Sequence, residues 1–158
     1  QWGFRAIANL GLRFEALGLP RHLKNFLTIL TRYPDMKVVL DHCMKPQIAT
    51  DQSVDFAFWA EGMTRLADET GAFCKYSALI TEAKADWHVE DLRPYVDHVL
   101  AAFGAERVMW GSDWPVCRLR GEYGEWRAAA MALTGSLSDA QSDAVYGQTA
   151  NLFYDLRL

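Results

Sequence analysis

Two side chains suited to hydrolytic chemistry stand just after short apolar runs of the chain. His42 comes after the apolar run 38–40 and Asp41, and Asp113 comes after the run 108–110 and lies within Gly-Ser-Asp-Trp-Pro. A neutral imidazole can accept a proton, ligate a metal ion or donate to a carbonyl, and a carboxylate can ligate a divalent ion and take a proton from water. In parallel α/β proteins such strand ends line the ligand crevice. We predict that His42 and Asp113 converge there as catalytic residues and as ligands of any bound metal. The alternatives are a loop histidine and an Asx-turn acid.

Four further side chains are candidates for contacting a substrate. Lys45 lies in the loop after His42 and is a candidate anchor for an anion, or else a surface lysine. Lys75 and Ser77 alternate along one apolar run and would share a face. A lysine there needs a counter-charge or a wet cavity, or it reaches out at the sheet edge. Trp114, with Trp110, flanks Asp113 and is predicted to form an aromatic wall that excludes water.

The remaining histidines and the cysteines have weaker claims on function. We expect His22 and His98 to be structural, and His88 to lie in a loop on the active face. The three cysteines are expected to be reduced thiols without a neighbouring base: Cys43, Cys74 and Cys117.

The composition indicates one globular domain that binds neither nucleic acid nor a membrane. The chain has 158 residues, of which 51% are hydrophobic, and its net charge is −4. That charge disfavours an anionic partner, and no apolar run approaches the roughly 18 residues of a membrane span. Odd, widely spaced cysteines favour a reducing compartment, the cytoplasm. Because the chain starts at Gln1 and runs at once into apolar residues, we expect it to begin in mid-fold.

Strand and helix patterns alternate along the whole chain. Continuous apolar runs predict strands at 12–17, 36–40, 73–79 and 107–111, and helical periodicity predicts helices at 1–10, 21–33, 55–70, 91–103, 123–133 and 138–146. Alternation without hairpin signals predicts βα units with a parallel sheet covered by helices. Four units are half of a (β/α)8 barrel, which needs about 250 residues. The rival is a small doubly wound sheet, but no glycine-rich phosphate loop follows any strand.

The order of several short motifs resembles one known family. The motifs are Asp41-His42-x-x-Lys45-Pro46, Cys74-Lys75-x-Ser77, residues 90–95, residues 107–115 and Asn151-Leu152-Phe153-Tyr154. In this order they resemble the C-terminal half of the lactone-hydrolysing branch of the amidohydrolase superfamily, which includes the fuconolactonases and the pyrone-dicarboxylate lactonases. The resemblance covers nearly all of the chain from about Leu12.

The resemblance implies a (β/α)8 barrel whose final-strand aspartate, here Asp113, is the general base and a ligand of any metal. The family's sixth-strand histidine matches His42. Some members use one divalent metal ion, often zinc, and others hydrolyse lactones without one. This chain contains no His-x-His pair, which the family carries on its first strand. We therefore expect residues 1–158 to be a partial barrel domain that lacks strands one to four and is inactive alone.

Three functions follow as hypotheses. The first is hydrolysis of a small-molecule lactone by water that Asp113 activates, with sugar lactones and pyrone carboxylates both open as substrates. The second is metal-dependent decarboxylation within the same superfamily. The third is a non-catalytic truncated half-barrel. Because half a barrel leaves two open sheet edges and an uncovered inner face, we also expect either self-association or pairing with a missing N-terminal half.

Overall fold

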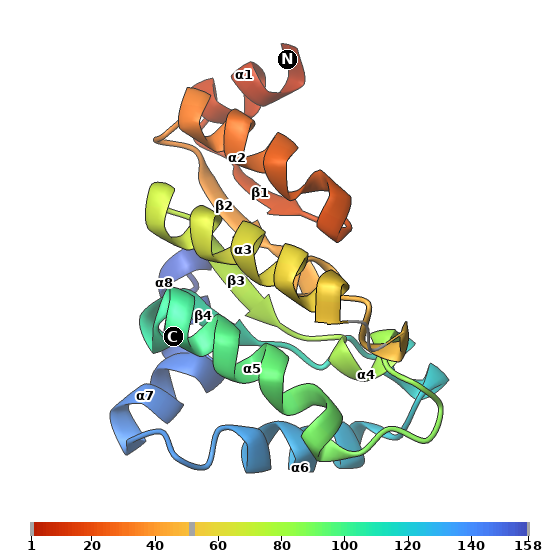
Figure 1. Ribbon diagram of the computed structural model, residues 1–158. Coiled ribbons are helices and arrows are strands. Elements are labelled where there is room, and N and C mark those ends of the chain that lie inside the picture. Colours follow the sequence, from red (N-terminus) through yellow and green to blue (C-terminus); the bar gives the residue numbers. More distant parts are fainter. Residues whose placement is uncertain (1, 51–52, 158) are drawn as a thin grey trace.

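The computed structural model describes residues 2–50 and 53–157, and its centre is a four-stranded sheet (Figure 1). The strands are β1 (Arg13–Ala16), β2 (Lys37–Leu40), β3 (Phe73–Tyr76) and β4 (Val108–Trp110). All three pairings are parallel and the order is β1-β2-β3-β4. This confirms the predicted half-barrel with strands in sequence order, and each strand lies within its predicted range. The prediction that Ser77 lies on a strand is wrong, since β3 ends one residue earlier.

Helices follow each strand, as the sequence pattern predicts, and one further helix precedes β1. They are α1 (Trp2–Asn9), α2 (Leu23–Arg32), α3 (Ser53–Glu69), α4 (Leu79–Glu82), α5 (Val89–Phe103), α6 (Tyr123–Leu133), α7 (Asp139–Asp143) and α8 (Thr149–Tyr154). The short α4 was not predicted, and the predicted helix 138–146 is α7 followed by a π-helical turn that leads into α8. The capping box at Ser138 is present as predicted.

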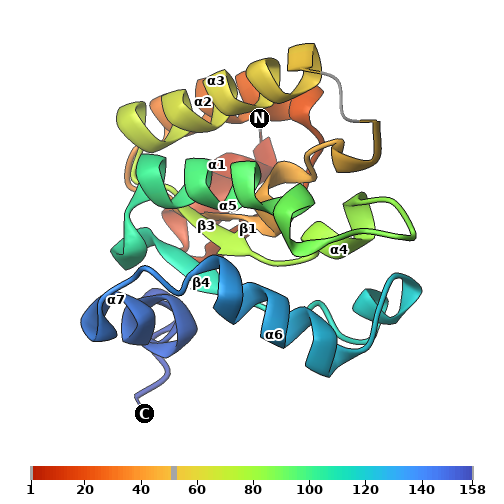
Figure 2. The same cartoon turned by 60° about the horizontal axis from the view of Figure 1, so that its bottom comes forward.

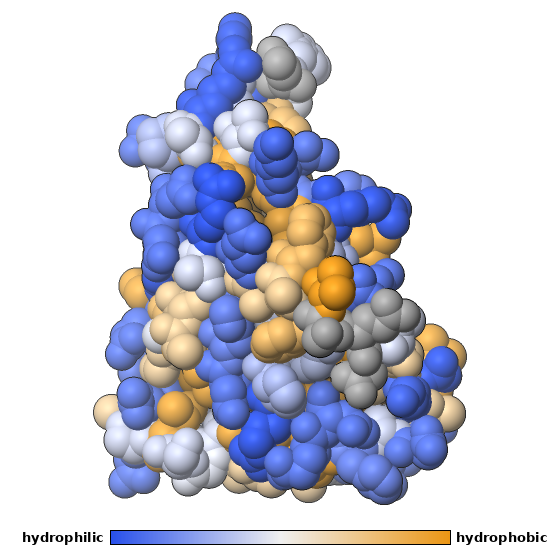
Figure 3. All heavy atoms as spheres, viewed as in Figure 1, coloured by the Kyte–Doolittle hydropathy of each residue, from blue (hydrophilic) through white to orange (hydrophobic). Residues whose placement is uncertain are grey.

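One face of the sheet packs under α2, α3 and α5, which lie in front of the strands in Figure 1 and above them in Figure 2. Alternation along the strands sends Val38, Leu40, Cys74 and Tyr76 into this main core. No helix in the described residues is long and apolar enough to cross a membrane. Figure 3 shows apolar patches among the polar side chains of this outer face.

The opposite face, which would line the inside of a barrel, is partly covered by the end of the chain. Phe153 of α8 packs against Val39 and Met109 in a second, smaller apolar cluster. Arg13 on β1 donates a hydrogen bond to the carbonyl of Phe153. Figures 1 and 2 show this blue end of the chain on the other side of the sheet from α3. The expectation of an uncovered inner face is therefore wrong in part.

Candidate active site

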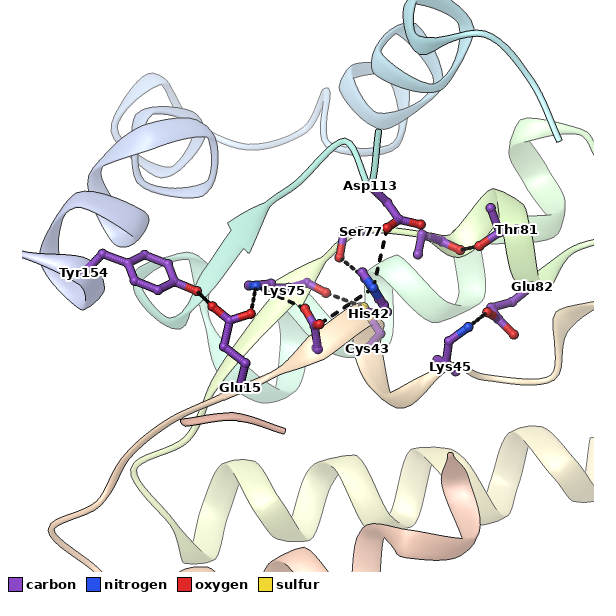
Figure 4. Close-up of polar contacts among 12 residues, drawn as sticks. Glu15, His42, Cys43, Lys45, Lys75, Ser77, Thr81, Glu82, Asp113 and Tyr154 are labelled. Carbon is purple, nitrogen blue, oxygen red and sulfur yellow. Dashed lines mark hydrogen bonds and ion pairs between the residues drawn. The ribbon is translucent and has the colours of Figure 1, made fainter. Parts of the chain in front are cut away.

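His42, Ser77 and Asp113 meet at the carboxyl edge of the sheet (Figure 4). His42 and Asp113 follow β2 and β4, and Ser77 follows the intervening β3. His42 Nε2 lies 3.6 Å from Asp113 Oδ1. His42 Nδ1 and Ser77 Oγ share a hydrogen bond of 2.8 Å. The two residues that the sequence singled out for chemistry are therefore neighbours, because parallel strands end at the same edge.

His42 opens a turn of four residues with left-handed backbone. The φ angles of His42, Cys43, Met44 and Lys45 are 52°, 49°, 60° and 50°. Because none of the four is glycine, each conformation costs roughly 1–2 kcal/mol. Surrounding contacts hold the turn, since Cys43 and Met44 are fully buried and the Lys45 amide donates to the His42 carbonyl at 2.8 Å. Such strain clusters where side chains must be held for function.

The two ring nitrogens of His42 face different groups. Nδ1 contacts Ser77, which is 2% exposed. Nε2 faces two carboxylates, at 3.7 Å from Asp41 Oδ2 and 3.6 Å from Asp113 Oδ1. Ser77, which was predicted as a substrate contact, is thus buried and bonded to Nδ1 of the imidazole, whereas Nε2 faces the two carboxylates.

Asp113 also has a left-handed backbone, with φ 54°, and its side chain is only 14% exposed. Burial raises the pKa of this carboxyl above its ordinary value. The nearby His42 and Lys45 act against that rise, and Asp41 and Glu82 add to it. A carboxylate that binds a proton more readily than usual is a better general base near neutral pH.

Both candidate lysines are paired with carboxylates of the chain. Lys45 Nζ contacts Glu82 Oε1. Lys75 Nζ lies 2.6 Å from Glu15 Oε2 and 3.2 Å from Asp41 Oδ1. Burial acts to lower the pKa of Lys75, but these two carboxylates outweigh it, so the pKa lies above its ordinary value and the ammonium stays charged. The expected counter-charge for a lysine in this strand is therefore present.

A chain of polar contacts links α8 to the site. Tyr154 donates to Glu15 Oε1 at 2.7 Å, and Glu15 in turn pairs with Lys75 (Figure 4). The hydrogen bond from Lys75 lowers the pKa of Glu15, burial opposes this, and Tyr154 adds to the lowering. The polar contacts run on through Asp41 to His42.

Trp110 does not contribute to the predicted aromatic wall. Trp110 packs among Trp126, Tyr123 and Tyr146 on the helix-covered face, so its expected place beside Asp113 is wrong. Strand alternation is the reason, since Trp110 shares the parity of Val108, which lies in the main core. Trp114 directly follows Asp113 in the chain and is 64% exposed.

The other histidines lie apart from these groups. His98 contacts the Ala60 carbonyl at 2.9 Å, and His22 accepts a hydrogen bond from the Leu19 amide, as expected of structural residues. His88 precedes α5 and lines a hollow of about 620 Å³ that also involves Ile48. Neither His42 nor Asp113 lines this hollow.

The family pattern described as Amidohydrolase matches residues 1–156. The chain belongs to the amidohydrolase family. An L-fucono-1,5-lactonase of Burkholderia ambifaria is 44% identical over 117 residues, which cover 74% of this chain and 39% of that protein. An L-fucono-1,5-lactonase of Burkholderia multivorans is 36% identical over 153 residues, covering 90% and 51%. This amidohydrolase chain thus spans about half the length of the curated relatives it matches, or less.

Solved structures agree with this assignment. A crystal structure of a Burkholderia multivorans amidohydrolase with bound zinc superposes with a TM-score of 0.88 at 33% identity, covering 96% of this chain and 56% of that one. The half-barrel of this amidohydrolase therefore corresponds to 56% of the chain of that related structure.

His42 and Asp113 offer two of the ligand types that zinc binds. Their separation of 3.6 Å suits one ion bound to both at about 2.0–2.2 Å. Within residues 2–50 and 53–157, however, no three His, Cys, Asp or Glu side chains form a cluster able to hold an ion. The donor types fit a metal and their number does not, so the described part of this amidohydrolase is at most part of a metal site.

Sequence reasoning missed the carboxylates that pair with the lysines. Asp41 stands beside His42 in the motif, and the alternation of residues 13–16 places Glu15 on the inner face, so both carried a signal. Glu82 lies in the unpredicted α4, and Tyr154 reaches the site only because α8 folds onto the inner face. No local pattern in the sequence of the amidohydrolase predicts that docking.

Proposed function

We propose that this chain forms the C-terminal half of an active site that hydrolyses a neutral sugar lactone. The observation that carries the proposal is the convergence of His42 and Asp113 at 3.6 Å on the carboxyl edge of the sheet. The support from relatives is that two proteins 36–44% identical are named L-fucono-1,5-lactonase. Since the matched parts are only 39% and 51% of those two proteins, the chain alone should be inactive.

Asp113 is the proposed general base. Its carboxylate takes a proton from water as the water oxygen attacks the lactone carbonyl. His42 Nε2, on the same side, donates a hydrogen bond to the carbonyl oxygen as negative charge develops there. Collapse of the tetrahedral intermediate breaks the ring C–O bond, and the proton held by Asp113 passes to the leaving alkoxide. The products balance as one hydroxy acid from one lactone and one water.

The charges around the site favour a neutral substrate over a carboxylated one. Lys45 was the candidate anchor for an anionic substrate and Lys75 a candidate substrate contact, but Glu82 pairs with Lys45, and Glu15 and Asp41 pair with Lys75. An anionic substrate would have to displace one of these carboxylates or lie beside them. A polyhydroxylated lactone carries no such penalty and can donate to them instead. Trp114 is the proposed apolar contact for the sugar ring.

A divalent ion, zinc by preference, is proposed as an optional cofactor with His42 and Asp113 as two of its ligands. Such an ion would polarise the lactone carbonyl and lower the pKa of bound water. A related amidohydrolase structure holds zinc. Further ligands would come from outside the described residues.

The test is a chimera in which the part of the Burkholderia multivorans lactonase outside the match, which we expect to be its N-terminal half, precedes residues 1–158. We expect this protein to open neutral aldonolactones and to leave pyrone dicarboxylates intact, while residues 1–158 alone do neither. The Burkholderia enzyme assayed in parallel is the control. A chimera that is folded by circular dichroism and inert toward every neutral lactone would contradict the proposal. Release of carbon dioxide from an aromatic acid would favour a decarboxylase instead.

A further inference from the structure

Two buried tryptophans support the two strand ends that carry the site. Trp59 of α3 donates its indole N–H to the carbonyl of Cys43 at 2.7 Å, and Cys43 directly follows His42. Trp126 of α6 donates to the carbonyl of Gly111 at 3.3 Å, two residues before Asp113. Each indole thus belongs to the next long helix after the strand whose end it contacts.

We propose that Trp59 and Trp126 are positioning residues: Trp59 fixes the position of His42, and Trp126 fixes the position of Asp113. Neither indole contacts a reacting group directly, and each acts through a backbone carbonyl. The role is defined relative to the hydrolysis proposed above, whereas the geometry itself can be tested without any activity.

The case for Trp59 rests on the left-handed turn that begins at His42. A turn of non-glycine residues with positive φ persists only where its surroundings over-determine it. The Trp59 hydrogen bond fixes the direction of the second peptide group of this turn. The Cys43 thiol adds a contact of 3.2 Å to the Lys75 carbonyl. Fixing the Cys43 peptide also fixes the backbone from which the His42 ring projects.

Trp59 is itself held from several sides. Its ring centroid lies 5.7 Å from Phe56, 5.2 Å from Tyr95 and 5.3 Å from His98, and its side chain is 1% exposed. The rings of this cluster come from α3 and α5, so the Trp59 hydrogen bond attaches the turn to two helices of the main core. Rigid support of the turn matters because a displacement of about 1 Å of a catalytic group can cost about a hundredfold in rate.

Trp126 supports the other side of the site in the same way. Its side chain is fully buried and packs edge-on against Tyr76, with ring centroids 5.5 Å apart. Tyr76 is the last residue of β3, the strand between those that carry His42 and Asp113. The indole bond to Gly111 therefore fixes the exit of β4 relative to the centre of the sheet.

The experiment uses the 158-residue chain with Trp59→Phe, which keeps an aromatic ring, removes the N–H donor and leaves a smaller side chain. The ring ¹⁵N shifts of His42, assigned by loss of its signals in His42→Asn, report its tautomer and surroundings. We expect these shifts to change in Trp59→Phe, and amide exchange of residues 42–45 to accelerate about tenfold, the scale of one lost buried hydrogen bond. In Trp126→Phe the accelerated amides should lie at 111–113.

Trp87→Phe is the matched control, because Trp87 also donates an indole hydrogen bond of 2.8 Å, to Arg120. It should leave His42 and the turn as in the wild type. Wild-type shifts and wild-type exchange in Trp59→Phe would overturn the proposal, as would equal changes in Trp87→Phe. If the variants fail to fold, indole exchange in the wild type decides: Trp59 and Trp126 must exchange far more slowly than the exposed Trp114, and equal rates would overturn the proposal.

Discussion

At the scale of single residues, the site combines a strained backbone with a carboxyl group whose ionised form is disfavoured by burial. His42 and Asp113 both have positive φ, and burial raises the pKa of Asp113. Folding therefore works against ionisation of Asp113, although general-base chemistry needs the ionised form. Such a cost in stability at a functional residue is common, and substitution often relieves it.

Asp113→Asn should therefore stabilise the chain at pH 7. Because the folded-state pKa of Asp113 is raised, its ionisation costs no stability below the ordinary carboxyl range, and the full cost appears once the pH exceeds the raised pKa. Asparagine also adopts positive φ readily. Urea denaturation should show a gain at pH 7 that shrinks toward pH 3. A loss of stability at pH 7 would show that Asp113 is instead held by favourable contacts.

The partners of Lys75 give a second prediction at this scale. Lys75→Met should destabilise the chain by about 1–3 kcal/mol, because Glu15 and Asp41 lose their shared cation. The loss is smaller than for a fully buried pair, because water screens part of it. Denaturation midpoints in urea measure this. Arg65→Met is the control, because Arg65 and Glu69 form an exposed pair within α3. An equal effect of the two substitutions would contradict the role given to Lys75.

At the scale of elements, the sequence predicted the four strands and the helices between them because each carries its own periodicity. The sequence also predicted that His42 and Asp113 lie at one edge of the sheet, since the carboxyl ends of parallel strands meet at the same edge. It failed where a structure depends on distant contacts. Trp110 faces the helices because of the strand's parity, and the helix predicted at 138–146 divides so that α8 can reach β1. The left-handed turn at His42 has little local signal, because Cys43, Met44 and Lys45 do not favour positive φ and only histidine is enriched there.

The docking of α8 onto the inner face can be tested with neighbouring residues. Phe153 is 4% exposed against Val39 and Met109, whereas Leu152 is 73% exposed. Phe153→Ala should cost about 3–5 kcal/mol, the usual loss for a buried phenylalanine, and Leu152→Ala should leave the urea midpoint nearly unchanged. Similar small effects of both would mean that α8 does not rest on the sheet.

At the scale of the whole molecule, the sheet has two edge strands, β1 and β4, and within the described residues each pairs with a strand on one side only. Leu10, Leu12 and Leu17, which flank β1, are at least half exposed. Open edges and exposed apolar side chains favour association. Light scattering of residues 1–158 over a wide concentration range should show dimers or larger species. A stable monomer throughout would count against the need for a partner.

The most direct test of the central claim is the effect of Asp113→Asn on the lactonase activity of the chimera. We expect kcat to fall by about 10²–10⁴-fold, the usual contribution of a general base. His42→Asn should cost less, since in the proposed mechanism His42 only polarises the carbonyl and takes no proton from water. Asp86→Asn, at an exposed loop carboxylate, is the control and should leave kcat unchanged. A folded Asp113→Asn chimera with near-wild-type kcat would contradict the account.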